Sequence, residues 1–296
     1  MKNTLYYYLI ILFTIFLWAT AFVGIRYTTG VFSGGALALL RYLVASFVML
    51  IIYCFHPYKV KPNMLDLAVF LGVGTLGFTI YNVTLNHGER TVPAAIAGFI
   101  VGQMPVIITL IAVIFFKERV KKWGIIGFVI SIIGLFLIVI AEKERGGFDS
   151  GIIYIFITAL SGAFYSIMQK PLAKKFHPVE IVTYAMWGGT LILLIYIPNL
   201  MHEMAIASLS KILTVIYMGI FPGAIAYLLW SFAMAKLPAA RVSSFLYLCP
   251  FVTLILGWLF LQEIPPLLAL SGGIVAIIGA YIIARNSYKK ATPIDS

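Results

Sequence analysis

Side chains that could bind a small polar molecule recur at helical spacing inside apolar segments of this 296-residue chain. Thr75, Thr79, Asn82 and Asn86 follow one another at intervals that place them on one face of a helix. Arg41 is the one charge clearly inside an apolar segment, where it could meet a carboxylate or backbone carbonyl groups. These residues predict a binding surface of hydroxyl, amide and guanidinium groups.

Other polar and aromatic side chains complete a predicted cavity lining that suits small zwitterionic or amphipathic metabolites. The alternative is that each side chain forms hydrogen bonds between helices without touching a substrate. For Arg41, substrate contact and a structural role are both compatible with the sequence. The candidate substrate-binding residues are Trp18, Arg41, Thr79, Asn82, Gln103, Tyr165, Gln169, Trp187, Tyr227 and Tyr247.

The elements that position these side chains are expected to be transmembrane helices. Hydrophobic residues make up 62% of the chain and charged residues 10%, against roughly half and a quarter in soluble domains. Apolar runs of roughly 18 or more residues predict membrane-spanning helices. We therefore expect an all-α integral membrane protein with ten transmembrane helices, over 5–26, 34–55, 66–86, 93–116, 123–140, 151–169, 180–198, 212–232, 238–261 and 265–284.

The net charge of +11 indicates how the chain inserts in the membrane, and not an affinity for nucleic acid. Most of the 21 lysines and arginines fall in alternate segments between the predicted helices. The positive-inside rule then places both termini in the cytoplasm, with a bacterial inner membrane as the expected location. The expected partners are the lipid bilayer and a small-molecule substrate, and the oligomeric state is left open.

The chain contains an internal repeat that is visible when the sequence is shifted by 145 residues. Each half holds five predicted helices, and because five is odd the second half enters the membrane inverted. We expect one repeat at 1–145 and another at 146–296, rocking around a shared central site. The matched pairs are Pro105 with Pro250, Glu118 with Glu263, Gly127 with Gly272 and Gly134 with Gly279.

Pro105 and Pro250 lie near the middle of the fourth and ninth predicted helices. Proline lacks an N–H and its ring clashes with the carbonyl four residues earlier, so each proline is predicted to kink its helix. The carbonyls released at Val101 and Leu246 need partners, which favours a position facing protein or a wet cavity. The kinks therefore indicate the substrate site, the alternative being that they only shape helix packing.

The repeated pattern resembles the EamA-type branch of the drug/metabolite transporter superfamily. The resemblance rests on FLWATAFVGIRY at 16–27, ALLRYLVA around Arg41, and the two repeat units that end at Glu118 and Glu263. It covers nearly the whole chain. It implies a ten-helix inner-membrane carrier with a central cavity, which commonly exports amino acids or related metabolites without ATP and in some members imports metabolites. It does not identify the substrate.

We expect a secondary transporter that moves a small organic metabolite, an amino acid or derivative, by alternating access, with export favoured over import. An integral-membrane enzyme and a channel are the alternatives from other classes. An enzyme is disfavoured because His56, His87, His177 and His202 lie at loops or helix ends and alternate between the two faces. No cofactor, metal site or ATP-binding loop is predicted.

The ten acidic residues fall at the ends of predicted helices, in loops or in the carboxyl-terminal tail. Glu89 follows the third predicted helix, and Glu118 and Glu263 are expected to stabilise turns or neighbouring helix ends. The sequence therefore places no carboxylate inside the membrane and does not support proton coupling through a buried acid.

Overall fold

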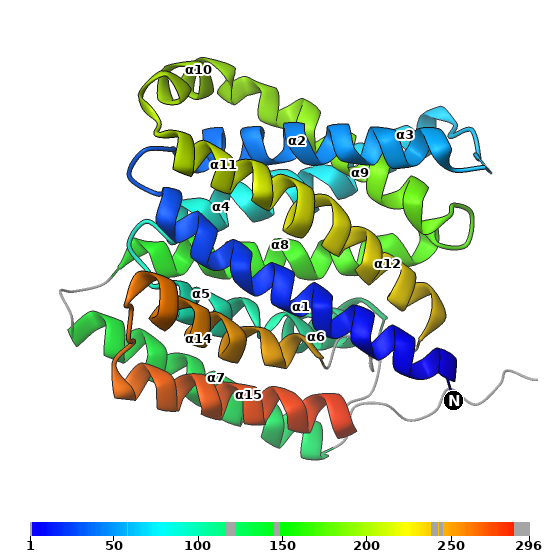
Figure 1. Cartoon of the computed structure of the whole chain (residues 1–296). Coiled ribbons are helices and arrows are strands. Elements are labelled where there is room, and N and C mark those ends of the chain that lie inside the picture. The colour runs from blue at the N-terminus through cyan, green and yellow to red at the C-terminus, as the bar shows by residue number, and fades with distance from the viewer. Residues whose placement is uncertain are drawn as a thin grey trace, which may run out of the picture.

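The computed structural model describes residues 2–57, 59–116, 122–144, 149–237, 242 and 245–286, and these residues form helices without a β-strand. Glu118 and residues 287–296 lie outside them. The helices form one bundle, and their axes are roughly aligned along it (Figure 1). The first half contains α1 (Lys2–Thr28), α2 (Gly34–Phe55), α3 (Met64–Gly74), η1 (Thr75–Ile80), α4 (Tyr81–Gly88), α5 (Ala94–Val101), α6 (Met104–Phe116) and α7 (Lys122–Glu144). The second contains α8 (Ser150–Leu172), α9 (Pro178–Leu193), η2 (Leu194–Tyr196), α10 (Ile197–Ile206), α11 (Leu209–Met218), η3 (Gly219–Ile225), α12 (Ala226–Lys236), η4 (Phe245–Leu248), α14 (Cys249–Leu261) and α15 (Leu267–Asn286).

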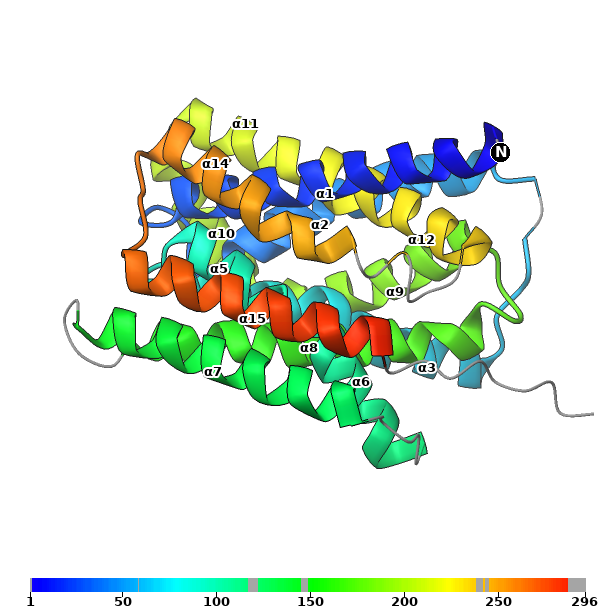
Figure 2. The ribbon, with the colours of Figure 1, turned by 90° about the horizontal axis from the view of Figure 1, so that it is seen from below.

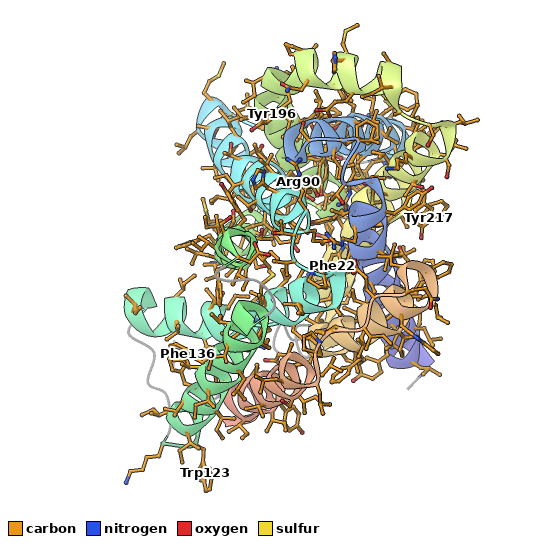
Figure 3. All side chains as sticks on the ribbon, turned by 90° about the vertical axis from the view of Figure 1, so that its left-hand side faces the viewer. Phe22, Arg90, Trp123, Phe136, Tyr196 and Tyr217 are labelled. Atoms are coloured by element: carbon orange, nitrogen blue, oxygen red, sulfur yellow. The ribbon has the colours of Figure 1, made fainter. Side chains whose placement is uncertain are left out.

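Among the described residues, eight helical segments are long and apolar enough to cross a membrane. Their outward side chains are apolar as well: Phe47, Trp123 and Phe136 are each 63% exposed, and Trp123 projects from one end of α7 in Figure 3. Helices with an apolar exterior of this kind belong in lipid, so the protein is an integral membrane protein. The segments are Leu5–Thr28, Gly34–Phe55, Met64–Gly88, Ala94–Ile111, Lys122–Ala141, Ser150–Gln169, Pro178–Ile206 and Leu209–Lys236, and two shorter apolar helices cover Phe245–Leu261 and Leu267–Ile283.

Polar side chains set the starting points of several helices. Asn63 and Asp66 form a reciprocal capping box at the start of α3, and Asp149 accepts the N–H of Gly151 at the start of α8. At α9, Glu180 is nearly fully buried, and its two oxygens accept the N–H groups of Val60 at 2.5 Å and His177 at 2.8 Å. These bonds satisfy N–H groups that have no partner within the helix.

Two π-helical segments, η1 and η3, occupy matching positions in the two halves. η1 begins directly after Gly74 and η3 begins at Gly219, and each of these glycines lies against the backbone of another helix. A Cβ on Gly74 would lie 2.0 Å from the carbonyl oxygen of Ala185 in α9, and a Cβ on Gly219 would lie 2.6 Å from that of Arg41 in α2. Single π turns inside α-helices are frequent at functional sites, and here they adjoin the cavity described below.

The fourth and ninth predicted helices are interrupted at their prolines. α5 ends at Val101 and α6 begins at Met104, so Pro105 lies in the first turn of a new helix. In the second half, the 3₁₀ turn η4 precedes α14, which begins at Cys249 and carries Pro250 in its first turn. Proline is well tolerated there because its missing N–H would have no acceptor within the helix. The structure thus has a break where the sequence predicts a kink in a continuous helix.

α7 and α15 lie side by side along one side of the bundle (Figures 1 and 2). A Cβ on Gly134 would lie 2.3 Å from the backbone nitrogen of Ala276, and a Cβ on Gly279 would lie 2.3 Å from that of Ser131. The hydroxyl of Ser131 donates a hydrogen bond to the carbonyl of Ala276 at 3.2 Å. Backbones approach this closely in membrane proteins where small residues line the crossing.

We expect Gly134→Ala to lower the free energy of unfolding by about 1–3 kcal/mol, because the new methyl group overlaps the backbone of α15. The measurement is thermal unfolding of the purified protein in detergent. Gly72→Ala is the matched control, since a Cβ there would meet no heavy atom within 4 Å. Equal destabilisation by both substitutions would contradict the close crossing.

Candidate functional site

A cavity within the bundle contains about 840 Å³ of space outside protein atoms, counting its mouth. Six of its described lining residues are aromatic, and Arg41 is the only charged residue among them. A largely apolar cavity with few polar groups is typical of a small-molecule binding site. Its lining consists of Trp18, Ala21, Phe22, Arg41, Gly77, Tyr81, Leu85, Gly98, Val101, Gly102, Met104, Gly162, Tyr165, Ser166, Tyr227, Trp230, Leu246 and Cys249.

Aromatic rings from α1, α8 and α12 pack together at this cavity. The ring of Trp18 lies 5.0 Å from that of Trp230 and 5.5 Å from that of Tyr227, and Tyr227 lies 6.2 Å from Tyr165, all between ring centroids. Phe22, one turn after Trp18 on α1, lies near the middle of the bundle in Figure 3. The buried indole N–H of Trp18 has no hydrogen-bond partner among the described residues. It is therefore a donor that a bound molecule could use.

Gly77 in η1 makes room for the ring of Tyr165. A Cβ at Gly77 would lie 2.2 Å from that ring, so any larger residue would displace Tyr165 from the cavity wall. Tyr81 and Leu85 follow Gly77 at four-residue intervals and also line the cavity. One face of the third membrane helix is thus turned toward the cavity over two turns.

Arg41 enters the cavity wall from α2 and is 3% exposed. Its Nε donates to the carbonyl of Met218 at 3.3 Å, and its Nη1 donates to Oδ1 of Asn82 at 3.2 Å. Pro222 lies four residues after Met218 and has no N–H to offer that carbonyl, and the guanidinium supplies a donor to it from another helix. The second terminal nitrogen of Arg41 makes no hydrogen bond to a described residue.

Four of the ten predicted binding residues line this cavity: Trp18, Arg41, Tyr165 and Tyr227. The predicted polar face of the third membrane helix is buried, but it packs against α2 and α9. Thr79 donates to the carbonyl of Gly189 in α9 at 2.8 Å, and Oδ1 of Asn82 accepts a hydrogen bond from Arg41 in α2. Helical spacing identifies a shared face correctly but does not tell which neighbour covers it.

Three of the remaining predicted residues join helices to one another. Gln103 accepts the hydroxyl hydrogen of Ser131 at 2.6 Å, Tyr247 donates to the carbonyl of Ala280 at 3.0 Å, and Trp187 donates to that of Ser46 at 3.3 Å. The fourth, Gln169, is half-buried on α8, one turn beyond Tyr165, and is absent from the described lining.

The repeat identifies lining residues that polar periodicity misses. Pairs separated by 145 residues line the cavity together, and most of them are apolar: Ala21 with Ser166, Leu85 with Trp230, Val101 with Leu246, and Met104 with Cys249. The last pair directly precedes Pro105 and Pro250, which do not themselves line the cavity. A search for repeat-related positions next to the two prolines would have found Met104 and Cys249.

The ends of α1, α4, α5 and α14 meet beside the cavity. Nε of Arg26 donates to Oε1 of Glu263 at 2.6 Å, and Nη1 of Arg26 donates to the carbonyls of Glu89 and Arg90 at 2.7 and 2.8 Å. Oε2 of Glu263 accepts the N–H of Ala94 at 3.4 Å. Glu263 thus holds three helix ends together, and it is placed there by a left-handed residue, Gln262, with φ of 54°.

Glu89 lies at a helix end, where the sequence places it, yet its side chain is buried. It follows α4 directly, but it is 0% exposed, and neither carboxyl oxygen has a hydrogen-bond partner among the described residues. Burial away from water raises the pKa of Glu89 well above its usual value, Glu263 raises it further, and Arg26 and Arg41 act in the opposite direction. Proximity to a helix end does not keep a side chain in water when other helix ends cover it.

We expect Trp18→Phe to leave stability within about 0.5 kcal/mol of the parent, because the lost N–H has no protein partner and the ring contacts persist. Ser131→Ala is the comparison, since it leaves the buried carbonyl of Gln103 without its donor and should cost about 1–3 kcal/mol. Thermal unfolding in detergent measures both. A larger loss for Trp18→Phe would show that its N–H already has a partner.

The chain is similar to known proteins in both sequence and fold. The profile of the EamA-like transporter family matches the chain twice, over residues 5–140 and 149–285. The chain is 34% identical to the uncharacterized transporter YdfC of Bacillus subtilis, over 89% of this chain and 86% of that protein. It is also 34% identical to a probable terminal-alkyne amino-acid exporter of Streptantibioticus cattleyicolor, over 93% of this chain and 92% of that protein. A solved structure titled "Crystal structure of protein" has the same fold, with a TM-score of 0.64 at 18% identity over 94% of this chain and 96% of that one.

Proposed function

Because this chain belongs to the EamA-like transporter family, we propose that it is a secondary transporter that exports a small organic metabolite, an amino acid or derivative, by alternating access. The observation that carries this proposal is the cavity that combines aromatic rings with one guanidinium group. The substrate carboxylate would bind the free nitrogen of Arg41, and its apolar part would pack against Trp18, Tyr227 and Trp230. The 34% identity to a protein named as a probable amino-acid exporter supports this substrate class and direction.

We propose that the cavity lies between two inverted repeats, at 1–145 and 146–296. The α7–α15 crossing supports this division, since Gly127 touches the carbonyl of Gly279 and Gly134 touches that of Gly272. These contacts exchange repeat-related positions, as a two-fold axis between antiparallel helices requires. The eight long apolar helices together with Phe245–Leu261 and Leu267–Ile283 would supply ten spans.

The membrane orientation follows from the charge distribution. Lysines and arginines gather in alternate loops, so we propose that both termini face the cytoplasm of a bacterial cell. The Arg26–Glu263 end of the cavity then faces outward. Rocking of the two repeats would open the cavity to one side at a time.

The experiment that tests this function has two stages. Metabolite profiling of cells that produce the chain identifies compounds lost from the cells and gained by the medium. Counterflow of the labelled compounds into proteoliposomes then tests for a carrier. Saturable counterflow supports the proposal. Accumulation inside the cells would reverse the proposed direction, and unsaturable flux would indicate a channel.

We expect Arg41→Gln to weaken binding of a carboxylate-bearing substrate about 10- to 100-fold, because it removes a charge-assisted contact. The measurement is the half-saturation concentration for counterflow, with thermal unfolding as a check on folding. Arg90→Gln is the matched control, since Arg90 is exposed. Unchanged half-saturation in a folded Arg41→Gln protein would exclude contact with the substrate.

A further inference from the structure

The buried carboxyl group of Glu89 has no role in the site described above. Tyr81, Leu85 and Glu89 follow one another at four-residue intervals, and the first two line the cavity. The same helical face therefore carries Glu89 to the end of the cavity, where the helix ends meet. Glu89 is 0% exposed, while the side chains of Arg26 and Glu263 at this end are 23% and 24% exposed. Glu89 thus lies deeper than the ion pair.

Charged groups face Glu89 from three other parts of the chain: Arg26 on α1, Arg41 on α2, and Glu263 after α14. Arg26 is already bound to Glu263 and to two backbone carbonyls, and Arg41 to Met218 and Asn82. α5 contributes only apolar residues over Ala94–Val101.

The remaining ionisable groups near Glu89 have partners of their own or lie outside the interior. On α8, Asp149 accepts the hydroxyl of Thr91. On the segment of Glu89 itself, His87 and Arg90 are exposed, and the ring of His87 lies tilted against that of Tyr154. No group in this set neutralises a Glu89 carboxylate by direct contact.

Glu180 shows what a buried carboxylate requires. Both of its oxygens accept backbone N–H groups, as an ionised carboxylate needs in the absence of water. Glu89 has no such donors among the described residues, and protonation removes the large cost of burying an unpaired charge. In this closed arrangement the neutral acid is the stable form.

We propose that Glu89 is a proton-binding site of the transport cycle, which takes up a proton when the Arg26–Glu263 end of the cavity closes and releases it when that end opens. The proton passes from water to a carboxylate oxygen, and it returns to water once the carboxylate is hydrated again. This inference rests on the proposed alternating access, and it identifies the proton as the coupling ion.

The sign of the pH dependence follows from the two states. In the open state Glu89 meets water and has an ordinary pKa, and in the closed state burial raises its pKa. Closure therefore binds a proton, so rising pH favours the open state between the two pKa values, by up to about tenfold for each pH unit. Below the ordinary pKa both states are protonated and the dependence disappears.

Cys249 offers a measurement that needs no substrate, because it lines the cavity. Cys54→Ser leaves Cys249 as the single cysteine of the chain, which has two. A membrane-impermeant methanethiosulfonate is applied to right-side-out and inside-out vesicles across a range of pH. The thiolate of Cys249 forms a mixed disulfide with the reagent's thioalkyl group, and methanesulfinate leaves. Each modification rate is divided by the rate for Cys54→Ser/Glu89→Gln at the same pH, which cancels the ionisation of the thiol.

We expect this ratio to rise with pH, by up to about tenfold per unit, in the vesicles whose Glu89 end faces the reagent. Glu89→Gln should hold that end closed at every pH, since its amide is neutral like the protonated acid. Glu89→Asp should retain a pH-dependent rate. Glu203→Gln is the control carboxyl at this end; Glu203 accepts the N–H of Ser33, is partly exposed, and should leave the ratio unchanged.

A flat ratio in both vesicle preparations would overturn the inference. Dividing the parent rate by the rate for Cys54→Ser/Glu203→Gln should give a ratio that does not change with pH, since this control should behave as the parent. A parent-to-Glu203→Gln ratio that rises with pH as steeply as the parent-to-Glu89→Gln ratio would assign the effect to carboxyl groups in general and overturn the inference. Counterflow separates the two proposals: a protein that transports but shows a flat ratio fails only as a proton-coupled carrier. A protein with the expected ratio that moves no tested metabolite fails only as a carrier of those metabolites.

Discussion

A guanidinium group inside an apolar bundle must be satisfied by protein groups, and the way Arg41 is satisfied constrains the helices around it. Its Nε binds the carbonyl of Met218, which Pro222 cannot serve, and its Nη1 binds Asn82. One side chain therefore ties α2 to the last residue of α11 in the second half and to α4 in the first half. The same bonds hold Arg41 in the cavity wall.

The same arrangement explains why few polar groups remain for a ligand. Thr79, Asn82, Gln103 and Tyr247 are all used in bonds between helices, as lipid-embedded chains must pair their polar groups internally. Among the described lining residues, the N–H of Trp18, the second terminal nitrogen of Arg41 and the hydroxyls of Tyr81, Tyr165 and Tyr227 form no hydrogen bond with a described residue. Specificity at such a site depends on few donors and on the shape of the aromatic wall.

The sequence predicts much of the helical arrangement because apolar length and glycine spacing depend on the chain alone. The doubled positions of Gly127 and Gly272 indicate helices that pack closely, and α7 and α15 do so. The neighbours that cover the polar helix face with Thr79 and Asn82 depend on how the helices pack. The spacing of residues along one helix does not contain this information. The burial of Glu89 depends on the ends of α1 and α14, which are distant in sequence, so its position at a predicted helix end does not reveal that it is buried.

The contact between α7 and α15 also limits how the bundle can move. Each glycine of one helix lies against the backbone of the other, so sliding along the axis would drive side chains into main chain. Rotation about the crossing point would keep these contacts. The crossing lies at one side of the bundle, away from the cavity lining, so in the proposed rocking of the two repeats it would serve as a fulcrum: a small angular change there would become a larger displacement at the far ends of the helices.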